Sequence, residues 1–411
     1  MKRKSIFAAA LLLAAVPWAL PHDAEATDQR ETFQSAANMW WNGPENVGAP
    51  PESLNQTSLA DIAAGNKHTV VLDSAGTVNA WGDNGQGQTD IPARLAETTV
   101  IAVAAGANHS LALTKDGEVI GWGRNADGQI SPPEGLKAAM IAAGGSGSLA
   151  IDRDGNVVYW GETAFGQGLI PQEVAESTIT DIAVGSGFNV ALDSEGHVYG
   201  WGRNDLGQTR IPDDLPPVKA IAAGTAHTVA LTNDGEIFAW GARKANAHDD
   251  IQLSDQGQTK VPSGIGSVMA IGAGAYHTAA ITTDGTLHVW GWDEAGPQTV
   301  EQFTETQESS GDTIKVVGGE RHTLAVAGLT PVNGETAPPP RPTPEPGPQP
   351  GGSAPDNPDS TIPDQGTGGQ QSDSLSSTGA VTPILAGLAA VLALAVGIGL
   401  LSIKTRKGNI Q

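Results

Sequence analysis

The sequence WGRNDLGQTRIP occupies residues 201–212, in the middle of the chain. It joins a Trp-Gly pair to a Gly-Gln pair and then to Ile-Pro. The Trp-Gly pair returns at intervals of about 40 residues, a period typical of repeat architectures. It begins at Trp81, Trp122, Trp160, Trp201, Trp240 and Trp290. We therefore expect a chain of similar units, each packed against its neighbours.

Each repeat contains three segments of strand length. An apolar run such as Ile221-Ala222-Ala223-Gly224 comes first, and the third residue after its glycine is usually histidine. The alternating segment Thr228-Val229-Ala230-Leu231, the turn Asp234-Gly235 and the strand into Trp240 then follow. Asp-Gly between apolar segments is a strong hairpin signal, so the pattern favours a β-propeller over a helical solenoid.

The two ends of the repeat array predict how the ring closes. Seven Gly-x-x-His-type starts are present, at Gly65, Gly106, Gly144, Gly185, Gly224, Gly274 and Gly319, but the six Trp-Gly strands leave one start without a partner. The strand around Met39-Trp40 supplies the missing one and completes the last blade, which begins at 314–326. We therefore predict an all-β fold, a seven-bladed β-propeller over residues 37–330 closed by an N-terminal strand.

These residues resemble a known family. The segment 201–209, the Ile-Pro that follows it and the Gly-x-x-His-Thr starts are similar to regulator of chromosome condensation repeats. The short period resembles the bacterial form found in propeller-type β-lactamase inhibitory proteins. The resemblance covers about residues 37–327 and implies the propeller fold and binding through loops on one face.

Composition excludes several classes of protein. The 411 residues contain no cysteine, which excludes a disulfide scaffold, a thiolate nucleophile and a Cys-ligated metal site. The formal net charge is −23, which argues against binding to nucleic acid because phosphate contacts need clustered Lys and Arg.

The N-terminal residues have the order of a secretory signal peptide. Residues 1–26 contain the basic start Lys2-Arg3-Lys4, the apolar run 6–16 and the small-residue site Ala24-Glu25-Ala26. We predict export of the chain, with residues 27–36 as an N-terminal lead before the propeller.

The C-terminal residues predict a stalk and an anchor. Residues 331–374 are rich in Pro, Gly and Ser, which is typical of an extended spacer. An uncharged run at 384–403 is long enough to cross a membrane as a helix, and the tail 404–411 is basic, which places it in the cytoplasm.

The pentapeptide 375–379, with the apolar run and the basic tail, resembles the cell-wall sorting signal of Gram-positive surface proteins. That resemblance implies cleavage between Thr378 and Gly379 by a sortase-like transpeptidase. The alternative is an ordinary C-terminal membrane anchor. Both alternatives place the chain on a bacterial cell surface.

The repeated polar residues predict neither a metal site nor catalysis. Five histidines, His68, His109, His227, His277 and His322, fall at equivalent positions and would form a ring rather than converge on one ion. We interpret them as structural, each bonded to its neighbour's backbone. The turn Asp152-x-Asp154-Gly155 resembles the start of a calcium loop but lacks the later Glu. With no catalytic or cofactor motif, we predict no cofactor, no metal and no enzyme activity.

One face of the ring is the candidate binding surface. The Gly-x-x-His turns and the loops after Trp-Gly should share a face, because neighbouring strands are antiparallel. The loop after Trp240 is longer than the others, with an insertion that includes 243–256. The candidate contact residues on this face are Lys67, Arg124, Arg203, Arg243, Lys244, Tyr276, Trp292 and Arg321.

The sequence therefore predicts a non-catalytic surface protein that displays a propeller as a module for binding an extracellular protein or surface ligand. A first alternative is an extracellular enzyme, a lyase or glycan hydrolase, with its site at the mouth of the channel. It requires titratable groups that converge in the central cavity. A second alternative is an inhibitor of β-lactamase-type enzymes. Among the seven residues that precede the histidine position, only Tyr276 is aromatic. The sequence therefore supports this alternative less than the other two functions.

Overall fold

The computed structural model describes residues 30–34, 39–44, 47–242, 255–291, 298–300 and 313–332. The predicted signal peptide, sorting pentapeptide, membrane helix and basic tail lie outside these residues, as does the stalk after residue 332. Within the described ranges, no helix is both long and apolar enough to cross a membrane.

The described strands form seven separate antiparallel sheets, the blades. Blade 1 contains β3 (Leu59–Ala64), β4 (His68–Asp73) and β5 (Val78–Gly82). Blade 2 contains β6 (Val100–Ala105), β7 (His109–Thr114) and β8 (Val119–Gly123). Blade 3 contains β9 (Ala138–Gly144), β10 (Gly147–Asp152) and β11 (Val157–Gly161). Blade 4 contains β12 (Ile179–Val184), β13 (Phe188–Asp193) and β14 (Val198–Gly202). Blade 5 contains β15 (Val218–Ala223), β16 (His227–Thr232) and β17 (Ile237–Gly241). Blade 6 contains β18 (Val268–Ala273), β19 (His277–Thr282), β20 (Leu287–Gly291) and β21 (Gln298–Val300).

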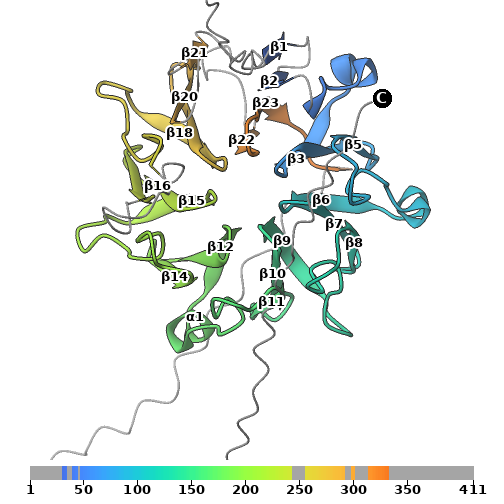
Figure 1. The fold of residues 1–411 in the computed structure, drawn as a ribbon, viewed down its shortest axis with the longest axis horizontal. Coiled ribbons are helices and arrows are strands. Elements are labelled where there is room, and N and C mark those ends of the chain that lie inside the picture. Colours follow the sequence, from blue (N-terminus) through green and yellow to red (C-terminus); the bar gives the residue numbers. More distant parts are fainter. Residues whose placement is uncertain are drawn as a thin grey trace, which may run out of the picture. The chain divides into compact units, whose positions relative to one another are not determined.

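The innermost strands make contact in a closed cycle, from β3 through β6, β9, β12, β15 and β18 to β22 (Thr313–Gly318) and back to β3 (Figure 1). No described sheet closes on itself into a barrel; the ring is built from separate sheets packed face to face. The prediction of seven propeller blades is confirmed.

Blade 7 joins the two ends of the repeat array. Its sheet has the order β1 (Arg30–Gln34), β2 (Met39–Pro44), β23 (Thr323–Leu329) and β22. The N-terminal strand thus closes the ring, because Met39 pairs with Val326. The outer strand β1 begins before residue 37, in the segment that we expected to be an N-terminal lead.

The register of the closing strand corrects one expectation. In blade 1, Trp81 pairs with Thr69, the residue after the histidine. In blade 7 the residue after the histidine is Thr323, and it pairs with Asn42, not Trp40. Asn42-Gly43 therefore takes the place of the Trp-Gly pair. The two-residue shift keeps the alternation of faces, so spacing alone could not exclude it.

The tryptophans pack between blades, as the sequence predicted. Trp122, only 4 % exposed, lies in a core cluster with Val70 and Leu72 of blade 1, and its indole N–H donates to the backbone carbonyl of Gln88 at 2.9 Å. The same bond joins each later Trp to the Gly-Gln loop of the preceding blade. Burial of large aromatic side chains at these boundaries stabilises the ring.

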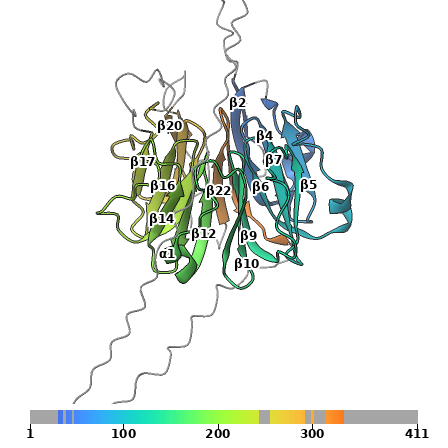
Figure 2. The same cartoon turned by 60° about the horizontal axis from the view of Figure 1, so that its bottom comes forward.

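The strands run between two faces of the ring (Figure 2). On the first, called here the loop face, the loop after Trp-Gly bonds to the Gly-x-x-His turn, as when Asp83 N donates to Lys67 O at 2.7 Å. On the opposite face, called the hairpin face, the hairpin bonds to the link before the inner strand: Ser74 N donates to Ser58 O at 2.9 Å. The shared loop face predicted from strand order is confirmed. Short helices η2 (Glu52–Gln56), η3 (Ala93–Glu97) and α1 (Gln172–Glu176) follow prolines of the links.

Candidate functional site

The inner rim of the loop face is fixed by backbone hydrogen bonds between blades. Glu320 N donates to Asn66 O at 2.8 Å, Asn66 N to Ala107 O at 3.2 Å, and Ala107 N to Gly145 O at 2.9 Å. Ala275 N donates to Gly319 O at 2.8 Å. These bonds link the turns of blades 6, 7, 1, 2 and 3, so this part of the rim presents its side chains from a fixed frame.

Three of the predicted contact residues lie on the turns of blades 6, 7 and 1. Lys67 is about half exposed, and its Nζ lies 3.9 Å from Glu320 Oε2 of the neighbouring blade. Tyr276 lines the mouth of the channel, where burial raises the pKa of its hydroxyl. Arg321 is the next residue after Glu320 and is partly exposed. The turns bring these groups to one side of the loop face.

Arg124 and Arg203 lie on the loops after Trp-Gly. Arg124 pairs with Asp127 at 3.4 Å, and both side chains are about one-third exposed. Arg203 donates two hydrogen bonds of 2.7 Å to the carboxylate of Asp205, and these bonds hold the pKa of that carboxyl below its usual value. Arg243, Lys244 and Trp292 lie outside the described residues.

Sequence reasoning missed an aromatic residue on the loop face. Phe165 follows the Trp-Gly pair of blade 3; its side chain is 49 % exposed, and the guanidinium of Arg203 lies 5.4 Å from its ring centroid. Phe165 N donates to Gln167 Oε1 at 2.8 Å, which anchors the backbone of this loop. Repeat alignment contained the signal, because the same bond to the Gly-Gln glutamine is made by Gln86, Asp127, Leu206 and Gln256 in other blades.

The same loop carries a second exposed apolar residue. Leu169 is 78 % exposed, and its N–H donates to Gly166 O at 3.0 Å. Residues that make the equivalent bond in other blades are all polar: Asp90, Ser131, Arg210 and Lys260. Blade 3 therefore exposes an apolar side chain at both positions, Phe165 and Leu169. Leu206 of blade 4, the one other apolar residue among those compared, is buried.

The histidines are structural, with partners different from those expected. His68 Nε2 lies 2.9 Å from Ser110 Oγ in the next blade, and Ser110 Oγ donates to Gln88 O. The acceptor is thus a side-chain hydroxyl rather than backbone. The other four histidines make the same kind of contact with a Ser or Thr of the next blade. No cluster of potential metal ligands occurs in the described part of the chain.

Burial keeps four of these histidines neutral. It lowers the pKa of His68 and His227 to about 4, and that of His109 and His322 to about 3. A charged imidazole would lose its hydration without gaining a partner at this boundary.

The turn considered for calcium is a local hydrogen-bonded turn. Oδ1 of Asp152 accepts the backbone N–H groups of Asp154 and Asn156 at 2.9 and 2.8 Å. Its other oxygen accepts the side-chain amide of Asn156 at 2.9 Å. These are the bonds of an Asx turn, and they explain the Asp at this position without a metal ion.

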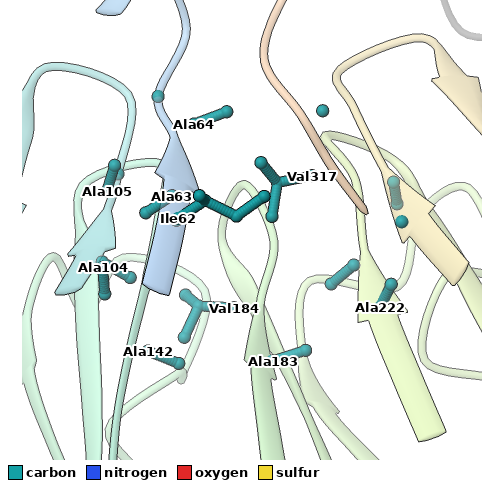
Figure 3. Close-up of a pocket in the computed structure, with 18 of the residues that line it drawn as sticks. Ile62, Ala63, Ala64, Ala104, Ala105, Ala142, Ala183, Val184, Ala222 and Val317 are labelled. Atoms are coloured by element: carbon teal, nitrogen blue, oxygen red, sulfur yellow. The ribbon is translucent and has the colours of Figure 1, made fainter. Parts of the chain in front are cut away.

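A cavity of about 870 Å³ runs along the axis of the ring. Its wall is formed mainly by small apolar residues of the innermost strands, among them Ala63, Ala142, Ala183, Val184 and Ala222 (Figure 3). Three charged residues of the inner strands also line it: Asp61, Asp181 and Lys315. Sequence reasoning did not single these residues out, although each occupies the third position of its strand.

Among the described residues that line the cavity, the charged side chains of the inner strands do not form a group of three or more carboxylates or histidines. Asp61 Oδ1 accepts the N–H of Ile62 and the Nζ of Lys315, and Oδ2 accepts the N–H of Val103, at 2.9, 2.6 and 2.9 Å. This carboxylate is already engaged in joining blades 7, 1 and 2. Asp181 lies on the opposite side of the ring, in blade 4.

Comparison with known proteins supports the repeat assignment. The family model of the Regulator of chromosome condensation (RCC1) repeat matches residues 59–88, 100–129, 179–208, 218–243 and 269–296, in blades 1, 2, 4, 5 and 6. Blade 3, with Gly147 at the histidine position, and blade 7, which is split between the chain ends, are not matched. No curated protein matches the sequence.

Several solved structures are similar to this chain, and the first named here supports the fold assignment. The crystal structure of human WBSCR16 is 20 % identical, covers 66 % of this chain and 87 % of its own, and superposes with a TM-score of 0.52. Prp20p from Saccharomyces cerevisiae, reported with its binding to Gsp1p and histones, is 20 % identical over 65 % and 81 % of the two chains, with a TM-score of 0.49. The CRINKLY WD40 ectodomain of the Arabidopsis thaliana receptor kinase ACR4 is 19 % identical over 64 % and 89 %, with a TM-score of 0.45.

Proposed function

We propose that this protein is a non-catalytic bacterial surface protein whose propeller binds another protein through the loop face. The observation that carries the proposal is the loop of blade 3, where Phe165 and Leu169 are exposed at positions that are polar or buried in other blades. Exposed aromatic and apolar groups next to arginine are the usual anchors of protein interfaces. Arg203, stacked on Phe165 and held by Asp205, supplies that arginine.

The position of the last described residues supports display of this face. Thr330 N donates to Leu59 O at 2.8 Å, and Val332 packs beside Gly76 of the first hairpin. Both contacts lie at the hairpin face. A stalk that continues from Val332 therefore starts on the side opposite Phe165. Anchoring through residues 375–403, by a sortase-like transpeptidase or as a single membrane span, belongs to the same proposal.

Charge indicates the kind of partner. The chain has a formal net charge of −23, and Glu162, Asp127 and Asp205 lie on the loops near Phe165. Arg124 and Arg203 are paired with two of these carboxylates, so the net charge of this group is the negative charge of Glu162. We infer a partner with an apolar contact residue flanked by basic groups.

The test compares variants that make blade 3 resemble its neighbours. In the double variant Phe165→Gln with Leu169→Ser, both residues are replaced by those of blades 1 and 2 at the equivalent positions. Surface and secreted proteins are captured on the immobilised full chain, and a purified partner is then titrated. We expect the double variant to weaken binding at least about tenfold.

The matched control is Arg94→Ala on the hairpin face, where Arg94 pairs with Glu118 at 2.9 Å and both side chains are more than half exposed. It should bind as the wild type does. Equal binding by all three proteins would contradict the role of the loop face. Turnover of a glycan substrate that is lost in Asp181→Asn would instead support the enzyme alternative.

A further inference from the structure

The third position of the innermost strands provides an internal comparison. In every blade, the residue at this position pairs with the residue at the equivalent position of the next strand. Asp61 pairs with Leu72, and Asp181 pairs with Leu192. In all seven blades a bulge directly precedes this position. From blade 1 to blade 7 its residues are Asp61, Ala102, Met140, Asp181, Ala220, Ala270 and Lys315.

Blades 7 and 1 show how this position holds an ammonium group. Lys315 Nζ lies 2.6 Å from Asp61 Oδ1, while the same carboxylate accepts the N–H groups of Ile62 in its own blade and Val103 in the next. The backbone bonds fix the carboxylate, and the lysine reaches it along the channel wall. Charge-assisted bonds of this length are stronger than neutral ones.

Blades 3 and 4 repeat half of this arrangement. Asp181 Oδ1 accepts the N–H of Ile182 at 2.8 Å, and the N–H of Ile221 in the next blade also bonds to this carboxylate. The preceding blade, however, has Met140 where blade 7 has Lys315, and Met140 packs on the cluster that contains Ile182. Within the described residues no basic side chain forms an ion pair with Asp181.

We propose that the channel binds a primary ammonium group carried on an apolar chain, with Asp181 as its counter-ion in the way that Asp61 serves Lys315. This site is separate from the loop face and goes beyond the proposed binding function. Lys315 and Asp61 neutralise each other, so the ionised carboxylate of Asp181 leaves one net negative charge among the inner-strand channel residues. A single cation balances it.

The wall fits the apolar part of such a ligand. Beyond Asp181, blades 4 and 5 line the cavity with Ala183, Val184 and Ala222 (Figure 3). Ala223 also lines it, and a volume of about 870 Å³ leaves room for a small alkyl chain. Burial of the methylene groups of the ligand adds to its affinity. The ammonium then lies near the hairpin face, where the inner strands begin, and the alkyl chain points toward the loop face.

The site should respond to pH. Burial raises the pKa of Asp181 to about 6, the two backbone N–H groups oppose this shift, and the positive charge of Lys315 opposes it weakly from across the channel. Asp61 and Lys315 are the other charged inner-strand residues that line the cavity, and Met140 is the neighbour on the preceding strand. Below pH 6 the carboxyl becomes protonated, so the amine should bind more weakly.

The probe is n-hexylamine, titrated calorimetrically into the full chain at pH 7.5, with 1-hexanol and hexanoate as controls for the alkyl chain and for charge. We expect hexylamine to bind at least about tenfold more tightly than hexanol. Asp181→Asn should remove this preference while leaving the weak binding of hexanol. Equal binding of hexylamine and hexanol, tighter binding of hexanoate, or no binding of hexylamine would overturn the proposal.

A second variant imitates the ion pair of Lys315 and Asp61 at Asp181. Met140→Lys places an ammonium group on the inner strand of the blade that precedes Asp181, just as Lys315 lies on the inner strand of the blade that precedes Asp61. This variant should prevent the binding of hexylamine, whereas Met140→Leu should leave it unchanged. Hexylamine binding that survives in Met140→Lys contradicts the site. Far-ultraviolet circular dichroism and the unfolding midpoint establish that each variant is folded. Titration with N-acetyl-lysine methylamide tests the source of the ammonium group. Binding of this probe would indicate that the site accepts a lysine side chain as well as a free amine.

Discussion

His68 and Ser110 join blades 1 and 2 by a single directed bond. Because Ser110 Oγ donates its own proton to the carbonyl of Gln88, the 2.9 Å contact requires the Nε2–H of His68 to be the donor. The proton is therefore on Nε2, and Nδ1 has no hydrogen-bond partner among the described residues. Protonation of the ring would place a second proton on a buried nitrogen that has nothing to accept it.

Acid should therefore destabilise the ring. Four histidines have a folded-state pKa of about 3 to 4, below the value of 6.5 in an unfolded chain. Between these values the unfolded state binds more protons, so the free energy of unfolding should fall as the pH drops below 6.5. At pH 5 each of these histidines costs about 2 kcal/mol. Asp181, with its raised pKa, acts in the opposite direction, but it is one group against four.

Urea unfolding at pH 7.5 and at pH 5 measures this effect, and His227→Phe tests its cause. Phe188 already occupies the histidine position of blade 4, where it is fully buried, so the fold accommodates Phe at this position. The variant should be less sensitive to acid than the wild type. An unchanged difference between the two pH values would exclude His227 as a contributor.

Substitution of Gly65 should be strongly destabilising. A Cβ atom at this position would lie 2.1 Å from Cε1 of His68 and 2.5 Å from the backbone oxygen of Gly106 in the next blade. The backbone contact cannot be relieved by rotation of a side chain, so Gly65→Ala should cost about 3 kcal/mol of unfolding free energy. The control is Gly85→Ala on an exposed loop, where the nearest atom to a new Cβ is 3.4 Å away. Equal midpoints in chemical denaturation would contradict this account.

Removal of the N-terminal strands should open the ring. Deleting residues 30–44 removes β1 and β2, leaves β23 as a sheet edge and takes Met39 and Trp41 from the core cluster that contains Leu324 and Val326. An exposed apolar edge promotes association. We expect a lower unfolding midpoint and concentration-dependent oligomers in size-exclusion chromatography. A deletion variant that stays monomeric with an unchanged midpoint would show that closure contributes little.

Lys315→Met should destabilise the chain modestly. It leaves Asp61, whose side chain is only 15 % exposed, without its cation. Because Lys315 is 40 % exposed, water screens the pair, and we expect a cost of about 1 kcal/mol in thermal or chemical unfolding. Arg94→Met, in a pair with both partners more than half exposed, should cost almost nothing. If channel carboxylates bind ammonium as proposed, Lys315→Met should also add a second hexylamine site at Asp61.

The periodic residues predicted most of the fold. Trp-Gly pairs, Gly-x-x-His turns and Asp-Gly hairpins repeat in register in most blades, and each has the same structural role wherever it occurs, so the blade count and the shared loop face could be read from them. Blade 7 was harder, because Asn42 replaces the tryptophan and the register could be fixed only by pairing with Thr323. Trp81 has no Gly-Gln loop in the blade before it. It therefore lacks the glutamine carbonyl to which the indoles of the later Trp-Gly pairs donate, and its Nε1 has no partner among the described residues.

The candidate sites were less predictable than the fold. Phe165, Leu169, Asp61, Asp181 and Lys315 are departures from the repeat, and sequence reasoning built on what recurs gave them no weight. An aligned comparison of the blades would have marked them as exceptions. That the carboxylates of Asp61 and Asp181 accept N–H groups from two blades depends on the bulges of the inner strands, which the sequence does not reveal.

The direction in which β23 leaves the ring has a mechanical consequence. The strand ends near the hairpin face, with Thr330 and Val332 held against blade 1. It is paired with β22 up to Leu329 on one side and with β2 over residues 323–326 on the other. Tension applied from a tether would first peel residues 330–332 from blade 1 and then act parallel to β23. The ladder bonds to β22 and β2 would then be loaded in shear instead of being broken one by one.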